Sequence, residues 1–259
     1  MSRLLVPVVA VSLLLAGCGS DDGSGEGASD ERALTVSAAA SLTDAFTDIG
    51  HDFEQRNDGV TVSFNFGPSD GLAGQINEGA PVDVFASASA TWMDVVQDEG
   101  PGVSGRTDLA RNTPAIIVPN DNPAGIDGLR DLARDGVQLV LAAEGVPIGD
   151  YAREIFANAG IADAALANVV SNEEDVRAVV TKVLSGDADG GIAYVTDVTS
   201  DVAGGITLIP IPDDVNVIAT YPIAVVSGSQ EADLAQRFVD YVVGEGQQTL
   251  VDYGFLPPA

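Results

Sequence analysis

Four connections in the chain share one local pattern, in which an apolar run is followed by Ser, Gly or Pro and then by a helix-like segment. They are Ala40-Ser41-Leu42, Gly67-Pro68-Ser69, Val146-Pro147-Ile148-Gly149 and the stretch from Ser171 to Val176. The first turn of a helix presents unpaired N–H groups and the positive end of the helix dipole, which together suit an anion. Two of these connections would add a serine hydroxyl as a donor. The pattern therefore predicts a site for a small anion.

The competing interpretation of Ser41 and Ser69 is that each is an ordinary helix N-cap. For either serine alone this is the simpler interpretation. Four such helix starts in a chain with 11 Lys+Arg favour a site built from neutral donors. The formal net charge of −28 does not exclude an anion site, because salt largely screens exposed charges that lie more than about 8–10 Å away.

Hydrophobic periodicity places these connections between strands and helices. Leu34 to Ser37, Val60 to Phe66 and Val82 to Ala86 are predicted strands, with helical segments between and after them. This β-α-β-α-β order is typical of a doubly wound, mostly parallel sheet, in which helix starts gather at the carboxyl ends of the strands. Ser41 is the predicted N-cap of the first helix. The segment from Leu234 to Tyr253 is predicted to be helical.

A second unit with the same alternation of predicted strands and helices begins near Pro114. The sequence thus predicts an α/β protein of two lobes, the first formed by residues 34–113 and 222–259 and the second by residues 114–221. Ala115–Val118 and Ile223–Val226 are expected to carry the chain between the lobes and to act as a hinge, as in binding proteins that close on a ligand.

The amino-terminal residues predict an exported protein with a lipid anchor. Residues 1–17 contain Arg3 and a short apolar run, which is typical of a signal peptide. The run ends in Leu-Ala-Gly-Cys, so Cys18 is the predicted lipidated residue of a lipoprotein, and residues 18–33 are a predicted flexible tether. The alternative is an ordinary signal peptide that happens to contain a cysteine.

Composition excludes several classes of protein. The acidic chain lacks the basic face that nucleic-acid binding requires, so no nucleic-acid partner is expected. One His and one Cys in 259 residues leave no His/Cys metal cluster and no Cys–His catalytic pair. We therefore expect a binding protein without enzymatic activity, resident cofactor or cation site.

The chain resembles the molybdate-binding proteins of bacterial molybdate ABC transporters. The resemblance extends from Leu34 to the carboxyl terminus, in family order and spacing. The matching stretches are VSAAASLTDAFTDI (36–49), SDGLAGQINEGAPVDVFASAS (69–89), WMD (92–94), VPIGDYARE (146–154), EEDVRAVV (173–180), GGIAYVTD (190–197), YPIAVV (221–226) and YGF (253–255). It implies a two-lobed periplasmic-binding-protein fold of type II that holds a tetrahedral molybdate or tungstate ion by hydrogen bonds, without a cation.

The resemblance also implies the ligand-binding residues. Ser41 and Ser69 would supply hydroxyl and backbone donors from one lobe, and Ile148 and Val176 would supply backbone N–H groups from the other. Tyr194 would supply its phenol; without the resemblance, it would be interpreted as a core aromatic residue.

Two charged residues near these positions have alternative interpretations. Asp70 either caps a helix beginning at Gly71 or faces the ligand, where it would repel a dianion. Arg177 either pairs with an acid across the cleft or is solvated, and the second is the preferred interpretation.

The predicted function is capture of molybdate, and of tungstate with it, outside the cell membrane, and delivery to an ABC permease with its ATPase. A monomer is expected. The alternatives are a receptor for sulfate, phosphate or a small carboxylate, a surface hydrolase, and a structural lipoprotein. A carboxylate receptor would normally offer an Arg for bidentate capture, and a hydrolase needs a base that the sequence lacks.

Overall fold

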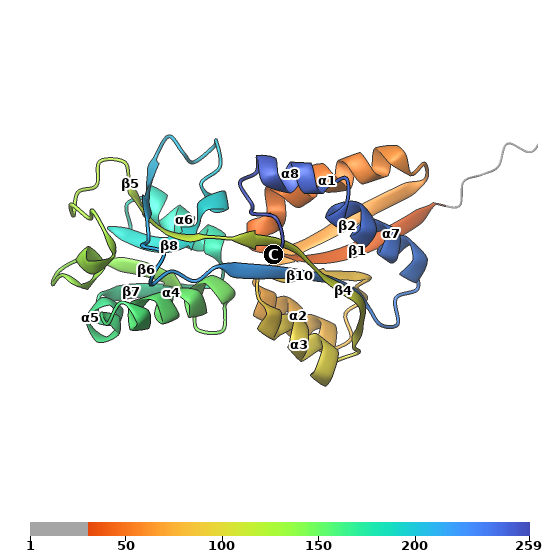
Figure 1. The fold of residues 1–259 in the computed structure, drawn as a ribbon, viewed down its shortest axis with the longest axis horizontal. Helices are drawn as coiled ribbons and strands as arrows, with labels where there is room; N and C mark the ends of the chain where they lie inside the picture. Colours follow the sequence, from red (N-terminus) through yellow and green to blue (C-terminus); the bar gives the residue numbers. More distant parts are fainter. Residues whose placement is uncertain (1–30) are drawn as a thin grey trace, which may run out of the picture. The chain divides into compact units, whose positions relative to one another are not determined.

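The computed structural model describes residues 31–259, which form two five-stranded sheets covered by helices (Figure 1). The order of strands is β2-β1-β3-β10-β4 in the first sheet and β7-β6-β8-β5-β9 in the second. We call the part built on the first sheet lobe 1 and the part built on the second lobe 2. The predicted signal peptide (1–17) and Cys18 lie outside the described residues.

Lobe 1 combines strands from both ends of the described chain. They are β1 (Arg32–Ala39), β2 (Val60–Gly67), β3 (Val84–Ala86), β4 (Val103–Asn112) and β10 (Ala219–Val226). β1 pairs in parallel with β2 and β3, with Ala39 opposite Gly67 and Ala38 opposite Ala86. This register places the carboxyl ends of the three strands side by side, so the segments that follow them lie at one edge of the sheet.

Lobe 2 is continuous in the sequence. Its strands are β5 (Pro114–Pro119), β6 (Leu139–Ala142), β7 (Val169–Glu173), β8 (Gly190–Tyr194) and β9 (Ile206–Pro210). β6 is parallel to β7 and β8, whereas β5 is antiparallel to β8 and β9.

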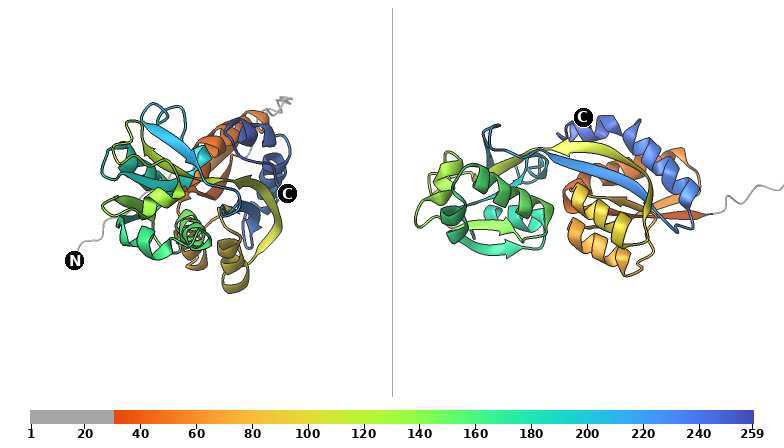
Figure 2. Two further views of the ribbon diagram at one scale, coloured as in Figure 1. Left: turned by 60° about the vertical axis from the view of Figure 1, so that its left-hand side comes forward. Right: turned by 60° about the horizontal axis from the view of Figure 1, so that its bottom comes forward.

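Helices cover the faces of both sheets (Figure 2). Lobe 1 carries α1 (Thr43–Arg56), α2 (Ser69–Asn77), α3 (Ala90–Glu99), α7 (Ala232–Val243) and α8 (Gln247–Asp252). Lobe 2 carries α4 (Pro147–Asn158), α5 (Ala162–Ala167) and α6 (Val176–Leu184). Short 3₁₀ helices are η1 (Ala40–Leu42), η2 (Leu129–Ala133) and η3 (Val195–Asp197). None of the helices between residues 31 and 259 has the length and apolar character that crossing a membrane demands.

The α/β fold with two lobes is confirmed, but the sheets are mixed, not mostly parallel. β10 is antiparallel to β3 and β4, as β5 is to its neighbours. The reason lies in the crossings. A strand that enters a lobe from the other lobe starts at the edge where the parallel strands end, and it must therefore run against them.

The chain crosses between the sheets just before the two strands that were expected to form the hinge. Thr113 separates β4 from β5, and residues 211–218 separate β9 from β10. β5 and β10 each lie within one sheet. The sequence analysis did not predict β4, which leads directly into the first crossing at Thr113.

Two further boundaries differ from the prediction. β1 begins at Arg32, so the last two residues of the predicted tether belong to the sheet. The predicted helix from Leu234 to Tyr253 is two helices, because Gly244 and Gly246 interrupt it between α7 and α8.

Candidate functional site

One cavity brings together all five residues that the sequence analysis assigned to the ligand. Its lining comes from both lobes, and its volume is about 20 Å³, slightly more than one water molecule needs. The space suits a ligand of a few atoms. The lining residues are Ala39, Ala40, Ser41, Gly67, Pro68, Ser69, Ala88, Val146, Pro147, Ile148, Asp175, Val176 and Tyr194.

Ser41 reaches the cavity from η1, directly after β1. It is not the N-cap of α1, because the chain first makes a 3₁₀ turn and Leu42 occupies the cap position. The Ser41 hydroxyl lies 2.9 Å from the Tyr221 hydroxyl in a hydrogen bond. Ser41 is 7% exposed, so this hydroxyl is shielded from bulk water.

Ser69 is the first residue of α2, and Pro68 is the N-cap, so the competing interpretation of Ser69 as an N-cap is wrong. Its Oγ accepts a hydrogen bond from the N–H of Ala88 at 3.0 Å. A hydroxyl that already accepts retains its own proton for donation. Because Ser69 begins the helix, its backbone N–H also has no partner within the helix.

Lobe 2 offers backbone donors from the first turns of α4 and α6. Ile148 and Val176 occupy these turns, where N–H groups have no intrahelical acceptor. α6 begins later than predicted, because β7 extends to Glu173 and Asp175 is the N-cap through a hydrogen bond from the Ala178 N–H.

Gly149 lets α4 begin very close to the end of β6. A Cβ at this position would lie 2.2 Å from the carbonyl oxygen of Ala143 and 2.5 Å from that of Ala142. Only glycine permits so close an approach of helix to strand. The position of the Ile148 N–H at the cavity therefore depends on the absence of a side chain at Gly149.

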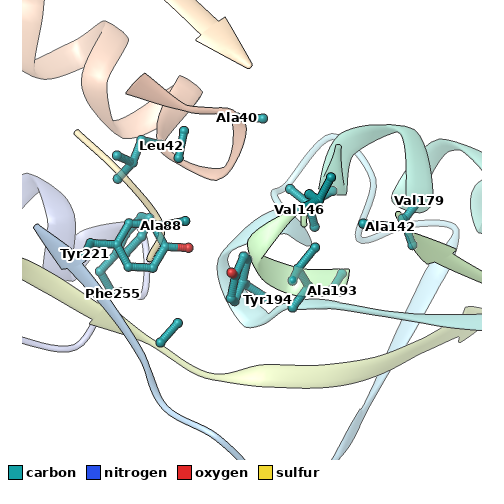
Figure 3. Packing of buried hydrophobic residues seen from close by; sticks show 14 of the residues in the cluster. Ala40, Leu42, Ala88, Ala142, Val146, Val179, Ala193, Tyr194, Tyr221 and Phe255 are labelled. Carbon is teal, nitrogen blue, oxygen red and sulfur yellow. The ribbon is translucent and has the colours of Figure 1, made fainter. Parts of the chain in front are cut away.

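Tyr194, at the end of β8, supplies a buried phenol to the cavity. It is 1% exposed, and its hydroxyl has no hydrogen-bond partner within residues 31–259. Its ring packs edge-on against that of Tyr221 from lobe 1, with 5.8 Å between ring centroids (Figure 3). Burial raises the pKa of Tyr194 well above its usual value, so the phenol remains a neutral donor. An unpaired buried hydroxyl is destabilising unless a ligand accepts its proton.

Asp70 does not line the cavity. It is the second residue of α2, not a cap for a helix that begins at Gly71, and one of its carboxylate oxygens lies near Gly145. Asp175 does line the cavity, but its Oδ1 accepts the hydrogen bond from α6.

Several side chains form hydrogen bonds from one lobe to the other beside this cavity. The indole N–H of Trp92 donates to the Gly145 carbonyl at 2.7 Å, and the Tyr151 hydroxyl donates to the Ala88 carbonyl at 3.3 Å. Arg177 donates to the Ala40 carbonyl and to the Asp44 carboxylate. The preferred interpretation of Arg177 as solvated was therefore wrong.

The donor set contains hydroxyl and backbone N–H groups, and no lysine or arginine side chain of residues 31–259 lines the cavity. Hydrogen bonds to a charged group each contribute about 1.5–3 kcal/mol net, so several that converge can hold an anion. Within residues 31–259, no group of three or more His, Cys, Asp or Glu residues is placed to hold a metal ion.

Comparison with known proteins identifies the family. The family model described as bacterial extracellular solute-binding protein matches residues 34–256. The molybdate-binding protein ModA of Mycobacterium tuberculosis is 38% identical over an alignment that covers 100% of this chain and 98% of the relative. The chain belongs to the ModA family of bacterial extracellular solute-binding proteins. ModA membership confirms the predicted resemblance and the expectation of a binding protein, not an enzyme.

Two further comparisons extend the ModA relationship. The putative ABC transporter substrate-binding lipoprotein YvgL of Bacillus subtilis is 28% identical, with 97% of this chain and 96% of that protein aligned. The periplasmic molybdate-binding protein of Azotobacter vinelandii has the same fold, with a TM-score of 0.75 at 18% identity over 87% of this chain and 100% of that chain.

Proposed function

We propose that the protein binds molybdate in the cavity between its lobes. Tungstate, a tetrahedral dianion with the same acceptors, would bind in the same way. The observation that carries the proposal is the buried Tyr194 hydroxyl, which has no partner in the described chain and shares a cavity with hydroxyl and N–H donors of both lobes. Ser41, Ser69, Ile148 and Val176 would complete the donor set. The ModA relatives support molybdate as the ion.

Delivery to an ABC permease with its ATPase completes the proposed function. The lobes, taken as 34–113 with 222–259 and 114–221, would close on the ion through the two crossings. The closed form would be the one that the permease recognises. We propose that the protein acts as a monomer outside the cell membrane, held there by a lipid on Cys18, as the lipoprotein relative YvgL supports.

Ligand-dependent thermal unfolding of the full-length protein in mild detergent tests the binding proposal. Molybdate, tungstate, sulfate and phosphate are compared at one concentration, since a ligand that binds only the folded state raises its stability. We expect stabilisation by molybdate and tungstate alone, because the cavity distinguishes tetrahedral ions by size. Stabilisation by sulfate or phosphate alone would change the ion, and no shift with any of them would overturn the oxyanion site.

The lipid anchor has a separate test. Cells that express the protein are labelled with a fatty acid, and the label on the wild type is compared with that on Cys18→Ala. We expect label and membrane association in the wild type only. Equal labelling of both proteins would contradict lipidation at Cys18.

A further inference from the structure

The carboxylate of Asp70 lies beside the cavity on the side that faces lobe 2. Asp70 is the second residue of α2 and directly follows Ser69, which lines the cavity. Its side chain is partly buried, and the Oδ1 oxygen is fully buried with no hydrogen-bond partner in residues 31–259. No Lys or Arg of this part of the chain forms an ion pair with it. A buried carboxylate oxygen without a partner is unfavourable.

The part of lobe 2 that Asp70 faces is Gly145, between β6 and α4. A Cβ at this glycine would lie 3.9 Å from Asp70 Oδ2 and 3.8 Å from Trp92 Cζ2. The Trp92 indole N–H donates to the Gly145 carbonyl at 2.7 Å. Asp70 and Trp92 therefore lie against the same residue of the other lobe. Trp92 stabilises this contact by a hydrogen bond, whereas Asp70 brings a charge to it.

Lobe 2 presents carboxylates to Asp70 at this contact. Glu144 precedes Gly145 in the sequence, and the Gly145 N–H donates to Asp150 Oδ1 at 2.8 Å, so this N–H already has an acceptor. The ion proposed for the neighbouring cavity is a dianion. When the lobes come together, Asp70 thus loses water and meets like charge.

We propose that the Asp70 carboxylate speeds release of the bound ion by destabilising the closed form of the protein. Closure would bury the carboxylate against Gly145, and opening would return it to water. The proposal rests on the proposed function, in which the ion must leave the cavity to reach a permease. Asp70 would then act on how long the ion stays rather than on which ion binds.

The rate affected should be dissociation rather than association. In the open form the carboxylate is hydrated, and salt largely screens its repulsion of an ion that is still more than about 8–10 Å away. The favourable interaction of Asp70 with the first turn of α2 is the same whether the lobes are open or closed. The burial of the charge therefore differs only between the closed form and the open form.

Asp70→Asn tests the proposal, because it removes the charge and keeps the size of the side chain. The full-length protein in mild detergent is loaded with radiolabelled molybdate and mixed with an excess of unlabelled molybdate, and the retained label is followed over time. We expect release about 5- to 30-fold slower than in the wild type, since a buried charged group has lost its cost. The slower release should persist at about 0.5 M salt, because salt screens exposed charges and not the burial of a charge.

Association is measured separately by tryptophan fluorescence after rapid mixing with molybdate. Trp92 is the one tryptophan of the sequence and lies against Gly145 beside Asp70. We expect the association rate of Asp70→Asn to stay within about twofold of the wild type. A faster association with unchanged release would show that Asp70 only repels the approaching ion, and would overturn the proposal.

Asp233→Asn is the matched control. Asp233 is also the second residue of a lobe 1 helix, α7, but it is exposed and does not line the cavity. The variant therefore makes the same change in net charge and in the first turn of a helix. It should release molybdate like the wild type, and an equal slowing in both variants would overturn the role of burial.

Asp70→Ala is the second variant, because an asparagine amide could donate a new hydrogen bond to lobe 2 and an alanine cannot. We expect it to slow release as well. Release at the wild-type rate in both Asp70 variants would overturn the proposal and leave the proposed function intact. Absence of molybdate binding by the wild type would instead overturn the proposed function and this proposal with it.

Discussion

Arg177 and Asp44 form an ion pair between the two lobes, with Arg177 Nη2 2.5 Å from Asp44 Oδ2. The same guanidinium donates from Nε to the carbonyl oxygen of Ala40 at 3.1 Å. Ala40 and Val176, the residue before Arg177, both line the cavity. One side chain therefore connects the lobe 1 part of the candidate site to the lobe 2 part.

Arg177→Gln should weaken molybdate binding about two- to fivefold at low salt. The pair is partly solvated, with side chains 43% and 38% exposed, and exposed pairs contribute only about 0.2–1 kcal/mol. The difference from the wild type should shrink as salt is added. Calorimetry at two ionic strengths measures both effects.

Arg106→Gln provides the control for this variant. It breaks the pair between Arg106 and Asp94, which lies within lobe 1 away from the cavity. We expect its affinity to equal that of the wild type. An Arg177→Gln protein that binds as tightly as the wild type at low salt would show that the pair makes no contribution to the closed form.

Tyr194→Phe should change stability and binding in opposite directions. Without ligand, the free energy of unfolding should stay the same or rise, because the variant removes a buried hydroxyl that has no partner in the described chain. Affinity for molybdate should fall by about 1.5–3 kcal/mol, the contribution of a hydrogen bond to a charged group. Chemical denaturation and calorimetry test the two effects separately. A loss of stability in the ligand-free variant, with unchanged affinity, would contradict the role of the phenol as a ligand donor.

Gly149→Ala should displace the start of α4 and abolish high-affinity binding. Its Cβ has no room between helix and strand, since two carbonyl oxygens lie within 2.5 Å of the position. We expect a marked loss of thermal stability as well. Gly74→Ala in α2 is the matched control, because a Cβ there meets no atom within 4 Å. That variant should be about 0.5–1 kcal/mol more stable than the wild type, and equal behaviour of the two variants would refute the packing argument.

Asp197 should make the protein less stable as pH rises from about 4 to about 7. Burial raises the pKa of this carboxyl from its ordinary 3.8 to about 7; nearby Asp175 and Asp44 add to the rise, whereas the Tyr194 N–H and Arg177 oppose it. The folded state then binds the proton more tightly than the unfolded state, so its stabilising contribution is complete below the unfolded pKa and is lost as pH approaches 7.

Asp197→Asn removes this titration and leaves an amide that can still accept from the Tyr194 N–H, as Asp197 Oδ2 does at 2.9 Å. Denaturant unfolding at a series of pH values gives the free energy of unfolding of both proteins. We expect the advantage of the wild type to decline between about pH 4 and pH 7. A difference that is constant with pH would contradict the raised pKa.

Sequence patterns predicted the parts of the site that depend on local structure. Ile148 and Val176 lie at helix starts, which the order of strand, turn residues and helix in the sequence predicts. The family resemblance added Tyr194, which also lines the cavity. The cap roles of Ser41 and Ser69 were wrong. Proline and the 3₁₀ turn shift the helix starts by one or two residues, and both hydroxyls bond instead to groups distant in the sequence.

The hydrogen bonds of Asn112 and Tyr221 behind the cavity were not predicted, because they form only in the folded protein. Asn112 closes a strand, β4, whose residues 104–108 are exposed and show no alternation of apolar and polar side chains. β4 is a strand because it pairs with β10, more than a hundred residues later. A contact of such sequence separation leaves no local signal that periodicity can detect.

The place of β10 in the first sheet sets an order for folding. β10 lies between β3 and β4, and β4 has no other strand partner in the described chain beyond a single bridge from Arg111 to Leu256. Lobe 1 therefore cannot close its sheet until the chain beyond residue 219 arrives, whereas lobe 2 draws all its strands from one uninterrupted stretch. Pairings between distant parts of the chain form slowly. We therefore expect lobe 2 to complete its sheet first. In lobe 1, β4 stays separate from the β2-β1-β3 part of the sheet until β10 pairs with both.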